Sequence, residues 1–239
     1  MRALLVQRWT LLSRLRRQFP FRLLKKAISN NVVTAASEIY SERLLQSLRD
    51  SEALLDGHFL LSSGRHAGRY VQCAKMLQYP ERAGAACADI ATMIGERFGT
   101  QPYDLVVGPA MGAVTMGYEL ARALSVPGIF AERANDAGFT LRRGFTIEAG
   151  ARVLVAEDVV TTGKSVKEVL AMLTEMGASE AAVASLVNRS GMENPFGENH
   201  AYFRLADLEI PSWEAADCPL CAAADNGPAV KPGSRPGIS

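Results

Sequence analysis

The sequence has almost no net charge and no long apolar run. Its 239 residues include 26 lysines and arginines and 25 aspartates and glutamates, which gives a formal net charge of +1. This balance provides no global basic field for nucleic acid, so no nucleic-acid partner is predicted. Because no apolar run is long enough to cross a membrane, no membrane association is expected either.

Cysteine and histidine are both scarce. Cys73 and Cys87 are well separated, in segments of helical or strand-like pattern, which predicts buried thiols of a cytoplasmic protein rather than a disulfide framework. Cys218 and Cys221 form a lone CxxC pair. The chain has three scattered histidines, His58, His66 and His200. Since zinc normally needs two such pairs or added histidines, no metal held by the protein is predicted, and a redox role is favoured even less.

The most informative segment runs from Ala151 to Leu170. It opens with an apolar run, Val153 to Ala156, which predicts a buried parallel strand. Two acids follow, Glu157 and Asp158. Apolar residues at helical spacing then predict a helix that starts at an N-cap serine, Ser165, and stops at Gly177.

The loop from Thr161 to Ser165 consists mainly of small and hydroxyl-bearing residues. A strand that turns tightly into a helix leaves backbone N–H groups free, and the helix dipole adds partial positive charge there. Gly163 would let the backbone approach a ligand closely, and the hydroxyls could add donors. The loop is therefore predicted to bind phosphate, with the two preceding acids near a ribose diol or a magnesium ion.

Two common phosphate motifs are absent. Gly163, Lys164 and Ser165 have the form of the end of a P-loop, but that loop needs a glycine where Asp158 stands. The dinucleotide fingerprint G-x-G-x-x-G does not occur. An ordinary strand, loop and helix with acids at an exposed strand end is the alternative.

Strands and helices alternate along the rest of the chain, which predicts a doubly wound parallel α/β sheet with its ligand at the carboxyl ends of the strands. Helices are expected over Ser37–Asp50, Ala83–Phe98 and Gly112–Leu124. Strands are expected over Tyr103–Val107, Val126–Phe130, Ala181–Val187 and Tyr202–Leu208, and a hairpin over Phe59–Cys73.

The segment from Val153 to Val166 closely resembles the motif by which type I phosphoribosyltransferases bind phosphoribosyl diphosphate (PRPP). The resemblance spans about Ala36 to Leu208 and implies the fold of that family, with a small N-terminal hood. It also implies Mg²⁺, carried mainly by PRPP, and a homodimer with a shared active site. The residues that it implies for PRPP binding are Glu157, Asp158, Val159, Val160, Thr161, Thr162, Gly163, Lys164 and Ser165.

Two other segments resemble the orotate phosphoribosyltransferases within this family. Arg189 follows a strand, where a planar guanidinium could bind both oxygens of a ligand carboxylate. The resemblance implies that Thr161 and Arg189 bind orotate, and a purine has no such carboxylate. A surface salt bridge is the alternative for Arg189. The hood motif of these enzymes matches Phe59, Leu61, Ser63, Gly64, Arg65 and Tyr70.

The segment from Glu132 to Phe145 is predicted to be a hairpin or mobile loop that turns at Asn135–Gly138. In the family, a loop at this place brings basic side chains to the leaving pyrophosphate. The usual lysines and histidine are missing, so Arg133 is predicted to act there, with Arg142 or Arg143 as alternatives. These arginines could instead simply solvate an exposed hairpin.

The chain is predicted to have three regions. Residues 1–33 are basic, with no acid before Glu38, and could be an organellar transit peptide, a membrane-surface helix or an extension without function, which is favoured. Residues 34–210 form the transferase domain. Residues 211–239 form a tail that is expected to be extended or disordered from Asp225 onward.

The resemblance implies a cytoplasmic enzyme that makes orotidine 5′-phosphate and pyrophosphate from orotate and PRPP in UMP synthesis. Glu157, Asp158 and Arg133 would be its catalytic residues. A purine phosphoribosyltransferase and a non-catalytic regulator that senses PRPP are the alternatives.

Overall fold

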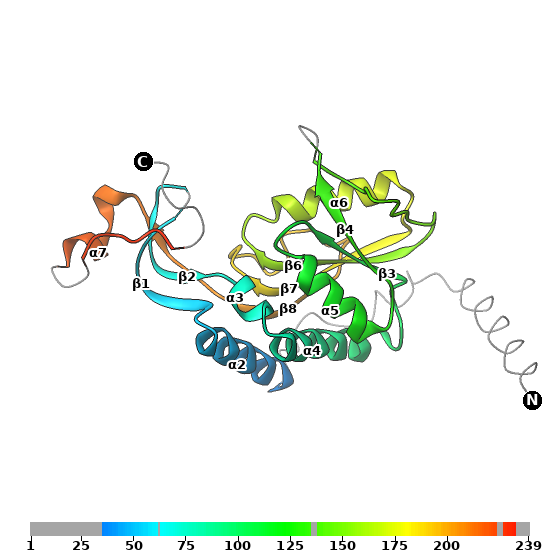
Figure 1. Ribbon diagram of the computed structural model, residues 1–239, viewed down its shortest axis with the longest axis horizontal. Helices are drawn as coiled ribbons and strands as arrows, with labels where there is room; N and C mark the ends of the chain where they lie inside the picture. Colours follow the sequence, from blue (N-terminus) through cyan, green and yellow to red (C-terminus); the bar gives the residue numbers. More distant parts are fainter. Residues whose placement is uncertain (1–34, 62, 135–137, 224–226, 233–239) are drawn as a thin grey trace, which may run out of the picture. The chain divides into compact units, whose positions relative to one another are not determined.

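The structure is a computed structural model that describes residues 35–61, 63–134, 138–223 and 227–232 (Figure 1). The chain divides into two units, Met1–Ala35 and Ala36–Ser239. The basic segment over residues 1–33 lies outside the described residues, and so does most of the turn predicted within Glu132–Phe145.

Six strands form the central sheet, in the order β5-β4-β3-β6-β7-β8. All neighbouring pairs are parallel except β4 and β5, which form a hairpin. This arrangement confirms the predicted doubly wound, mostly parallel sheet. The strands are β3 (Leu105–Pro109), β4 (Gly128–Arg133), β5 (Phe139–Thr140), β6 (Arg152–Val160), β7 (Glu180–Asn188) and β8 (Tyr202–Asp207).

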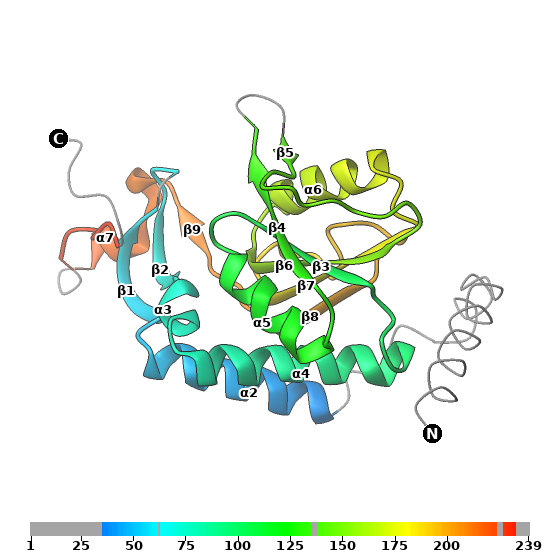
Figure 2. The same ribbon diagram turned by 45° about the vertical axis from the view of Figure 1, so that its right-hand side comes forward.

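Helices cover both faces of this sheet (Figure 2). On one face lie α4 (Pro80–Phe98) and α5 (Val114–Leu124), with α2 (Ala35–Asp50) packed beneath α4. The other face is covered by α6 (Lys164–Glu175). The buried apolar side chains accordingly form two clusters, one for each face. Because β3, β6 and β7 are buried from both sides, their sequences read as almost continuous apolar runs.

The start of α6 differs from the prediction. Gly163, not Ser165, is the N-cap residue, and its φ of 70° lies in the left-handed region that glycine tolerates best. The predicted end is confirmed, since α6 stops at Glu175 and Gly177 follows with a φ of 81°.

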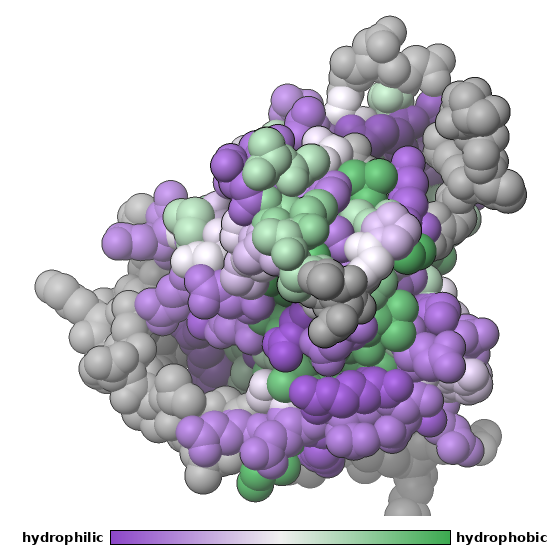
Figure 3. Space-filling view, turned by 90° about the vertical axis from the view of Figure 1, so that its left-hand side faces the viewer, coloured by the Kyte–Doolittle hydropathy of each residue, from purple (hydrophilic) through white to green (hydrophobic). Residues whose placement is uncertain are grey.

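A smaller antiparallel sheet forms the hood, in the order β1-β2-β9. It contains β1 (Leu54–Leu60), β2 (His66–Val71) and β9 (Ser212–Trp213), and α3 (Ala74–Leu77) leads from it to α4. The predicted hairpin is confirmed, but its strands are longer than expected. Seen from the hood side, hydrophobic residues appear in patches between hydrophilic ones (Figure 3).

The C-terminal tail is part of the hood, which the sequence did not indicate. After β9 it forms η3 (Ala215–Asp217) and α7 (Pro219–Ala222), which lie beside β1 and β2 in Figure 1. Val230 then returns to β1: its N–H donates to the His58 carbonyl at 2.8 Å and its carbonyl accepts from the Leu60 N–H at 2.9 Å. The backbone around Val230 is therefore extended, and it is paired with β1.

No helix in the described part of the chain is long and apolar enough to span a membrane.

The contact between α5 and β4 gives a test of this packing. A Cβ atom at Gly128 would lie 2.7 Å from the Ala121 Cβ, so Gly128→Ala should push the helix from the strand and lower the free energy of unfolding by about 1–3 kcal/mol. Gly95, on α4, has open space around the same position, so Gly95→Ala should raise stability by about 0.5–1 kcal/mol. Urea unfolding of both variants measures these effects, and equal stability of the two would contradict the packing described.

Candidate active site

Two adjacent carboxylates lie at the carboxyl end of β6. Burial, together with the nearby Asp158 carboxylate, raises the pKa of Glu157 to about 8. Burial also raises the pKa of Asp158, although its Oδ1 accepts a 2.8 Å hydrogen bond from the Val159 N–H, which opposes that shift. No basic side chain contributes to either shift. The pair therefore forms an acidic, desolvated site that favours a cation or a positively charged sugar ring.

The loop after β3 lies beside this acid pair. A Cβ atom at Gly112 would be 3.5 Å from the Asp158 Oδ1, so the backbone of the loop approaches the carboxylate closely. Gly108, within the strand end, has no room for a side chain, because its Cβ would be 2.6 Å from the Ala113 carbonyl oxygen. The glycines at Gly108 and Gly112 therefore let the backbone of this loop pack closely against its neighbours, Asp158 among them.

The loop from β6 to α6 has the form expected of a phosphate site. Gly163 is buried, and a Cβ there would be 2.8 Å from the Phe196 ring, so only glycine fits. Thr161 and Thr162 are exposed, and the Thr162 hydroxyl accepts a 3.3 Å hydrogen bond from the Lys164 N–H. The loop thus presents hydroxyls and the first N–H groups of a twelve-residue helix to solvent.

Arg133, at the end of β4, reaches this loop. Its guanidinium donates to Glu168 at 2.9 Å and to the Ser165 hydroxyl at 3.3 Å, and it lies 4.5 Å from the centre of the Phe139 ring. Arg143 instead pairs with a glutamate on β4 at 2.8 Å, and Arg142 is exposed. Of the three predicted arginines, the structure therefore brings Arg133 against the first turn of α6, while its part in catalysis stays a prediction.

Arg189 lies at the same edge of the sheet, directly after β7. Its backbone N–H donates to the Val160 carbonyl at 2.7 Å, which places it next to Thr161, the residue after β6. Its Nε is buried and has no hydrogen-bond partner among the described residues. Burial lowers its pKa, and the groups that oppose this shift are Cys73 and Tyr70, from the hood side.

The alternative of a surface salt bridge does not describe this arginine, because it forms no ion pair with any residue that the structure describes. A buried charged donor without a partner costs free energy, on the order of 1–3 kcal/mol or more. An anionic ligand group would remove that cost. Cys73 also links the two halves of the site, since its thiol lies 3.9 Å from the Asp158 carbonyl oxygen.

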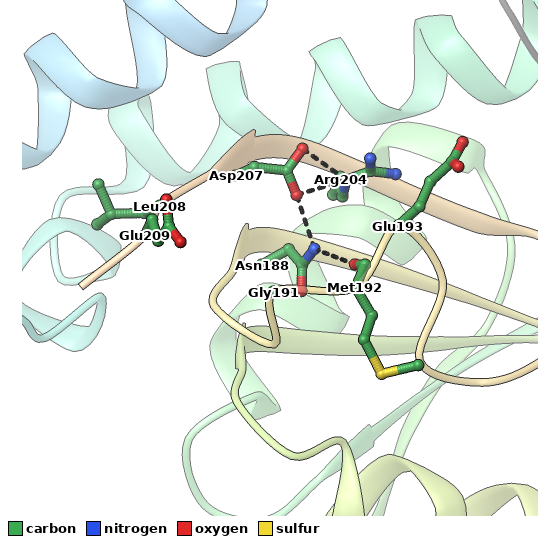
Figure 4. Close-up of a pocket in the computed structure, with 8 residues that line it drawn as sticks. All are labelled: Asn188, Gly191, Met192, Glu193, Arg204, Asp207, Leu208 and Glu209. Carbon is green, nitrogen blue, oxygen red and sulfur yellow. Dashed lines mark hydrogen bonds and ion pairs between the residues drawn. The ribbon is translucent and has the colours of Figure 1, made fainter. Parts of the chain in front are cut away.

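Asn188 is a site residue that sequence reasoning missed. Its amide nitrogen donates to Asp207 at 2.6 Å and to the Met192 carbonyl at 2.9 Å (Figure 4). Its oxygen accepts from the Ser190 hydroxyl at 2.7 Å. These bonds fix the loop that carries Arg189. The available signal was a single polar residue at the end of an apolar strand, but its partner on β8 could not be read from local sequence.

An open depression lies on the outer side of this loop (Figure 4). Its acid, Asp207, is already paired with Arg204 at 2.7 Å and with Asn188. We therefore regard it as support for the Arg189 loop rather than as the reaction site. The depression is lined by Asn188, Gly191, Met192, Glu193, Arg204, Asp207, Leu208 and Glu209.

A second group of polar side chains lies in the hood, outside this site. It consists of His58, His66, Cys218 and Cys221, whose possible ligand atoms all lie within 4.8 Å of one another. The view that the histidines are scattered is therefore wrong for two of the three, because the β1–β2 hairpin brings them together. His200 is elsewhere, with its Nδ1 2.8 Å from the Ala181 carbonyl oxygen.

The raised pKa of Glu157 predicts an unusual dependence of stability on pH. The folded state holds this proton more tightly than the unfolded chain, so the contribution of Glu157 to stability is fully present below about pH 4.5 and is lost as pH rises toward about 8. Glu157→Gln cannot ionise. It should therefore exceed the parent in free energy of unfolding by on the order of a few kcal/mol at about pH 8.5, and by little at about pH 5.

Urea unfolding at the two pH values measures this difference. Glu148→Gln is the matched control, since Glu148 is exposed. A gain of the Glu157 variant that is the same at both pH values would contradict the assignment.

Comparison with known proteins agrees with this geometry. The family described as phosphoribosyl transferase domain matches residues 78–203. Orotate phosphoribosyltransferase of Caldicellulosiruptor saccharolyticus is 50% identical over 194 residues, 81% of this chain and 97% of its own. The enzyme of that name from Heliobacterium modesticaldum is 46% identical over 194 residues, 81% of this chain and 98% of its own.

A solved structure shows the same fold. The orotate phosphoribosyltransferase of Mycobacterium tuberculosis H37Rv, in complex with inorganic phosphate, is 26% identical, with a TM-score of 0.53 over 71% of this chain and 95% of that one. The matches to whole relatives cover the acid pair, the phosphate loop and the sheet edge that carries Arg189. The chain therefore belongs to the phosphoribosyltransferase family and, within it, to the orotate phosphoribosyltransferases.

Proposed function

We propose that the protein transfers the ribosyl phosphate group of PRPP to orotate, which gives orotidine 5′-phosphate and pyrophosphate in UMP synthesis. The observation that carries this proposal is the half-buried guanidinium of Arg189, whose Nε is buried and has no partner in the described structure. It lies at the same sheet edge as an acid pair and a phosphate loop. Orotate has a carboxylate that a guanidinium can bind with two hydrogen bonds.

Each loop at this edge has a separate task in the proposal. The loop from Thr161 to Ser165 holds the 5′-phosphate with backbone N–H groups and hydroxyls. Glu157 and Asp158 accept hydrogen bonds from the ribose hydroxyls. The backbone after β3, which approaches Asp158 at Gly112, faces the pyrophosphate. Thr161 and Arg189, on neighbouring strand ends, orient orotate.

Mg²⁺ fits the donors that are present. Hard carboxylate oxygens suit this ion, and both acids are desolvated without a basic partner. The ion would be carried mainly by PRPP, and when bound it would neutralise charge on the pyrophosphate. The protein's own contribution is to hold two carboxylates in fixed positions beside the ribose.

The transfer breaks the bond between ribose C1 and the pyrophosphate oxygen and forms a bond from C1 to N1 of orotate. Pyrophosphate leaves with the bonding electrons, and orotate N1 releases its proton to solvent. Positive charge develops on the ribose ring as the first bond breaks. A nearby cation favours the ionised form of Glu157 and Asp158, and their desolvated carboxylates then stabilise that charge more strongly than water would.

Arg133 is proposed to neutralise the leaving pyrophosphate. Its ion pair with Glu168 holds it beside the phosphate loop, close to where a bound substrate would lie. An exposed pair of this kind is weak, about 0–1 kcal/mol, so a pyrophosphate could replace Glu168 as its partner. By likeness to the family we also propose a homodimer that shares its active sites and a cytoplasmic location.

Two other functions are weighed against this one. A purine phosphoribosyltransferase would share the phosphate loop and the acids, but a purine offers no carboxylate to Arg189. A regulator that senses PRPP and binds nucleic acid would need a basic surface. The dense basic run is the segment over residues 1–33, outside the described structure.

Arg189→Ala should lower kcat/KM for orotate by at least about 100-fold, because the carboxylate loses a two-point charged contact worth about 3 kcal/mol or more. Arg189→Lys should recover only part of this loss, since lysine keeps the charge but not the planar fork. The KM for PRPP should change much less. Steady-state kinetics at varied orotate and PRPP measure this split.

Arg43→Ala is the control for loss of a surface arginine, because Arg43 is an exposed residue of α2 that pairs with Asp89 on α4. An Arg189→Ala variant that keeps its affinity for orotate would overturn the assignment of the base site.

Deletion of residues 1–33 separates an enzyme from a regulator. All groups assigned to the reaction lie between Gly112 and Arg189, with the hood nearby, so the shortened protein should keep turnover within about twofold. A regulator should instead lose nucleic-acid binding on deletion. The two measurements are the turnover number with orotate and the affinity for a labelled DNA duplex, each with and without the segment.

A further inference from the structure

The four side chains gathered in the hood have the geometry of a metal site. His58 Nε2 lies 2.9 Å from His66 Nδ1 and 3.6 Å from the sulfur of each cysteine, Cys218 and Cys221. The Cys221 sulfur is 3.3 Å from His66 Nδ1. All four atoms fall within 4.8 Å of one another, so they surround one small volume.

These separations match tetrahedral zinc. Bond lengths of about 2.0–2.1 Å to nitrogen and 2.3 Å to sulfur place neighbouring ligands roughly 3.3 Å apart for two nitrogens and 3.5 Å for a nitrogen and a sulfur. The nitrogen–sulfur distances of 3.3–3.6 Å agree with that value. The nitrogen–nitrogen distance of 2.9 Å is slightly shorter.

The protonation of His58 also suits a ligand. Its Nδ1 lies 3.1 Å from the Gly227 carbonyl oxygen, which can only accept a hydrogen bond. Nδ1 therefore carries the proton, and Nε2 presents its lone pair to the centre of the group. Histidines that bind metals commonly have this second hydrogen bond, which fixes the ring and its tautomer.

The cysteines reach this place because the tail is attached to the hood on both sides of them. Before them, β9 pairs with β2, with His66 opposite Trp213. Arg65 reinforces that pairing by hydrogen bonds to the side chain and backbone of Ser212. After them, Val230 bonds to β1 through the His58 carbonyl. Backbone contacts independent of the four side chains thus set their positions.

We propose that His58, His66, Cys218 and Cys221 bind one Zn²⁺ ion in a closed structural site. Thiolates and imidazoles together are the ligand set that selects zinc among common divalent ions, and four protein ligands leave no open position for a substrate. Binding releases the two thiol protons to solvent, so that two thiolates balance the charge of the ion. The expectation from sequence of no metal held by the protein is thereby reversed.

The ion would fasten the tail to the hood. Its ligands come from β1, the start of β2, the N-cap of α7 and the third residue of α7. Besides the bonds of Arg65, a two-residue strand and one isolated bridge join the tail to the hairpin. Small sheets of this kind commonly need such a covalent or metal link. The far end of β2 carries Tyr70, one of the groups that act on the pKa of Arg189. Loss of zinc should therefore affect the orotate side of the site more than the phosphate loop.

Metal analysis of the full chain, produced without an affinity tag in zinc-supplemented medium and kept reduced, tests the site. The expected result is about one zinc per chain after gel filtration, and none in the double variant Cys218→Ser, Cys221→Ser. The controls His200→Asn and Cys87→Ala change a histidine and a cysteine outside the group and should keep the metal. Circular dichroism checks that every variant is folded.

Cobalt substitution gives a second readout that does not depend on yield. Cobalt in place of zinc should show the intense visible bands of tetrahedral coordination and thiolate charge transfer in the parent, and lose them in the double variant. A strong chelator should lower the Tm of the parent, but not that of the double variant.

The proposal is overturned if the reduced parent binds no zinc on titration, if the controls lose the metal as the double variant does, or if Cys218 and Cys221 form a disulfide that persists in reducing buffer. The effect on orotate KM rests on the proposed function, whereas metal content and the cobalt spectrum do not. Zinc present without any orotate turnover would therefore reject the proposed function and leave the metal site standing.

Discussion

The protein holds a desolvated acid pair and a half-buried guanidinium at one sheet edge without pairing them with each other. Burial raises the pKa values of Glu157 and Asp158 and lowers that of Arg189, and neither acid is among the groups that act on the arginine. Such desolvated charges are costly for a folded chain. A ribose ring that becomes cationic beside the acids would offset the cost of the acid pair, and a carboxylate of the base would offset that of Arg189. The unpaired groups are therefore explained by substrate binding.

The fold explains how these charges stay apart. Three parallel strands, β3, β6 and β7, end at the same edge, and their rigid spacing fixes the loops that follow. Asn188 locks the loop of Arg189 to β8, and the Phe196 ring leaves room only for Gly163 in the phosphate loop. Cys73 and Tyr70, from the hood side, are the groups that act on Arg189. The attachment of the hood to the tail therefore bears on the base site.

Most elements and the central acids could be predicted from the sequence because their signals are local. The run from Val153 to Ser165 contains its own strand, acids, turn and helix start, and only the helix cap was misplaced. Contacts between distant segments could not be read in this way. Asn188 depends on Asp207 in another strand, and His58 lies 160 residues from Cys218. Local spacing of cysteines and histidines therefore indicated no metal site.

The most direct test of the account compares bases with and without a carboxylate in the presence of Mg²⁺ and PRPP. Loss of orotate absorbance should proceed, while uracil, which is orotate without its carboxylate, and adenine, hypoxanthine and xanthine should turn over at least about 100-fold more slowly. Equal turnover of uracil and orotate, or turnover of a purine alone, would contradict the claim that the unpaired guanidinium of Arg189 selects the base.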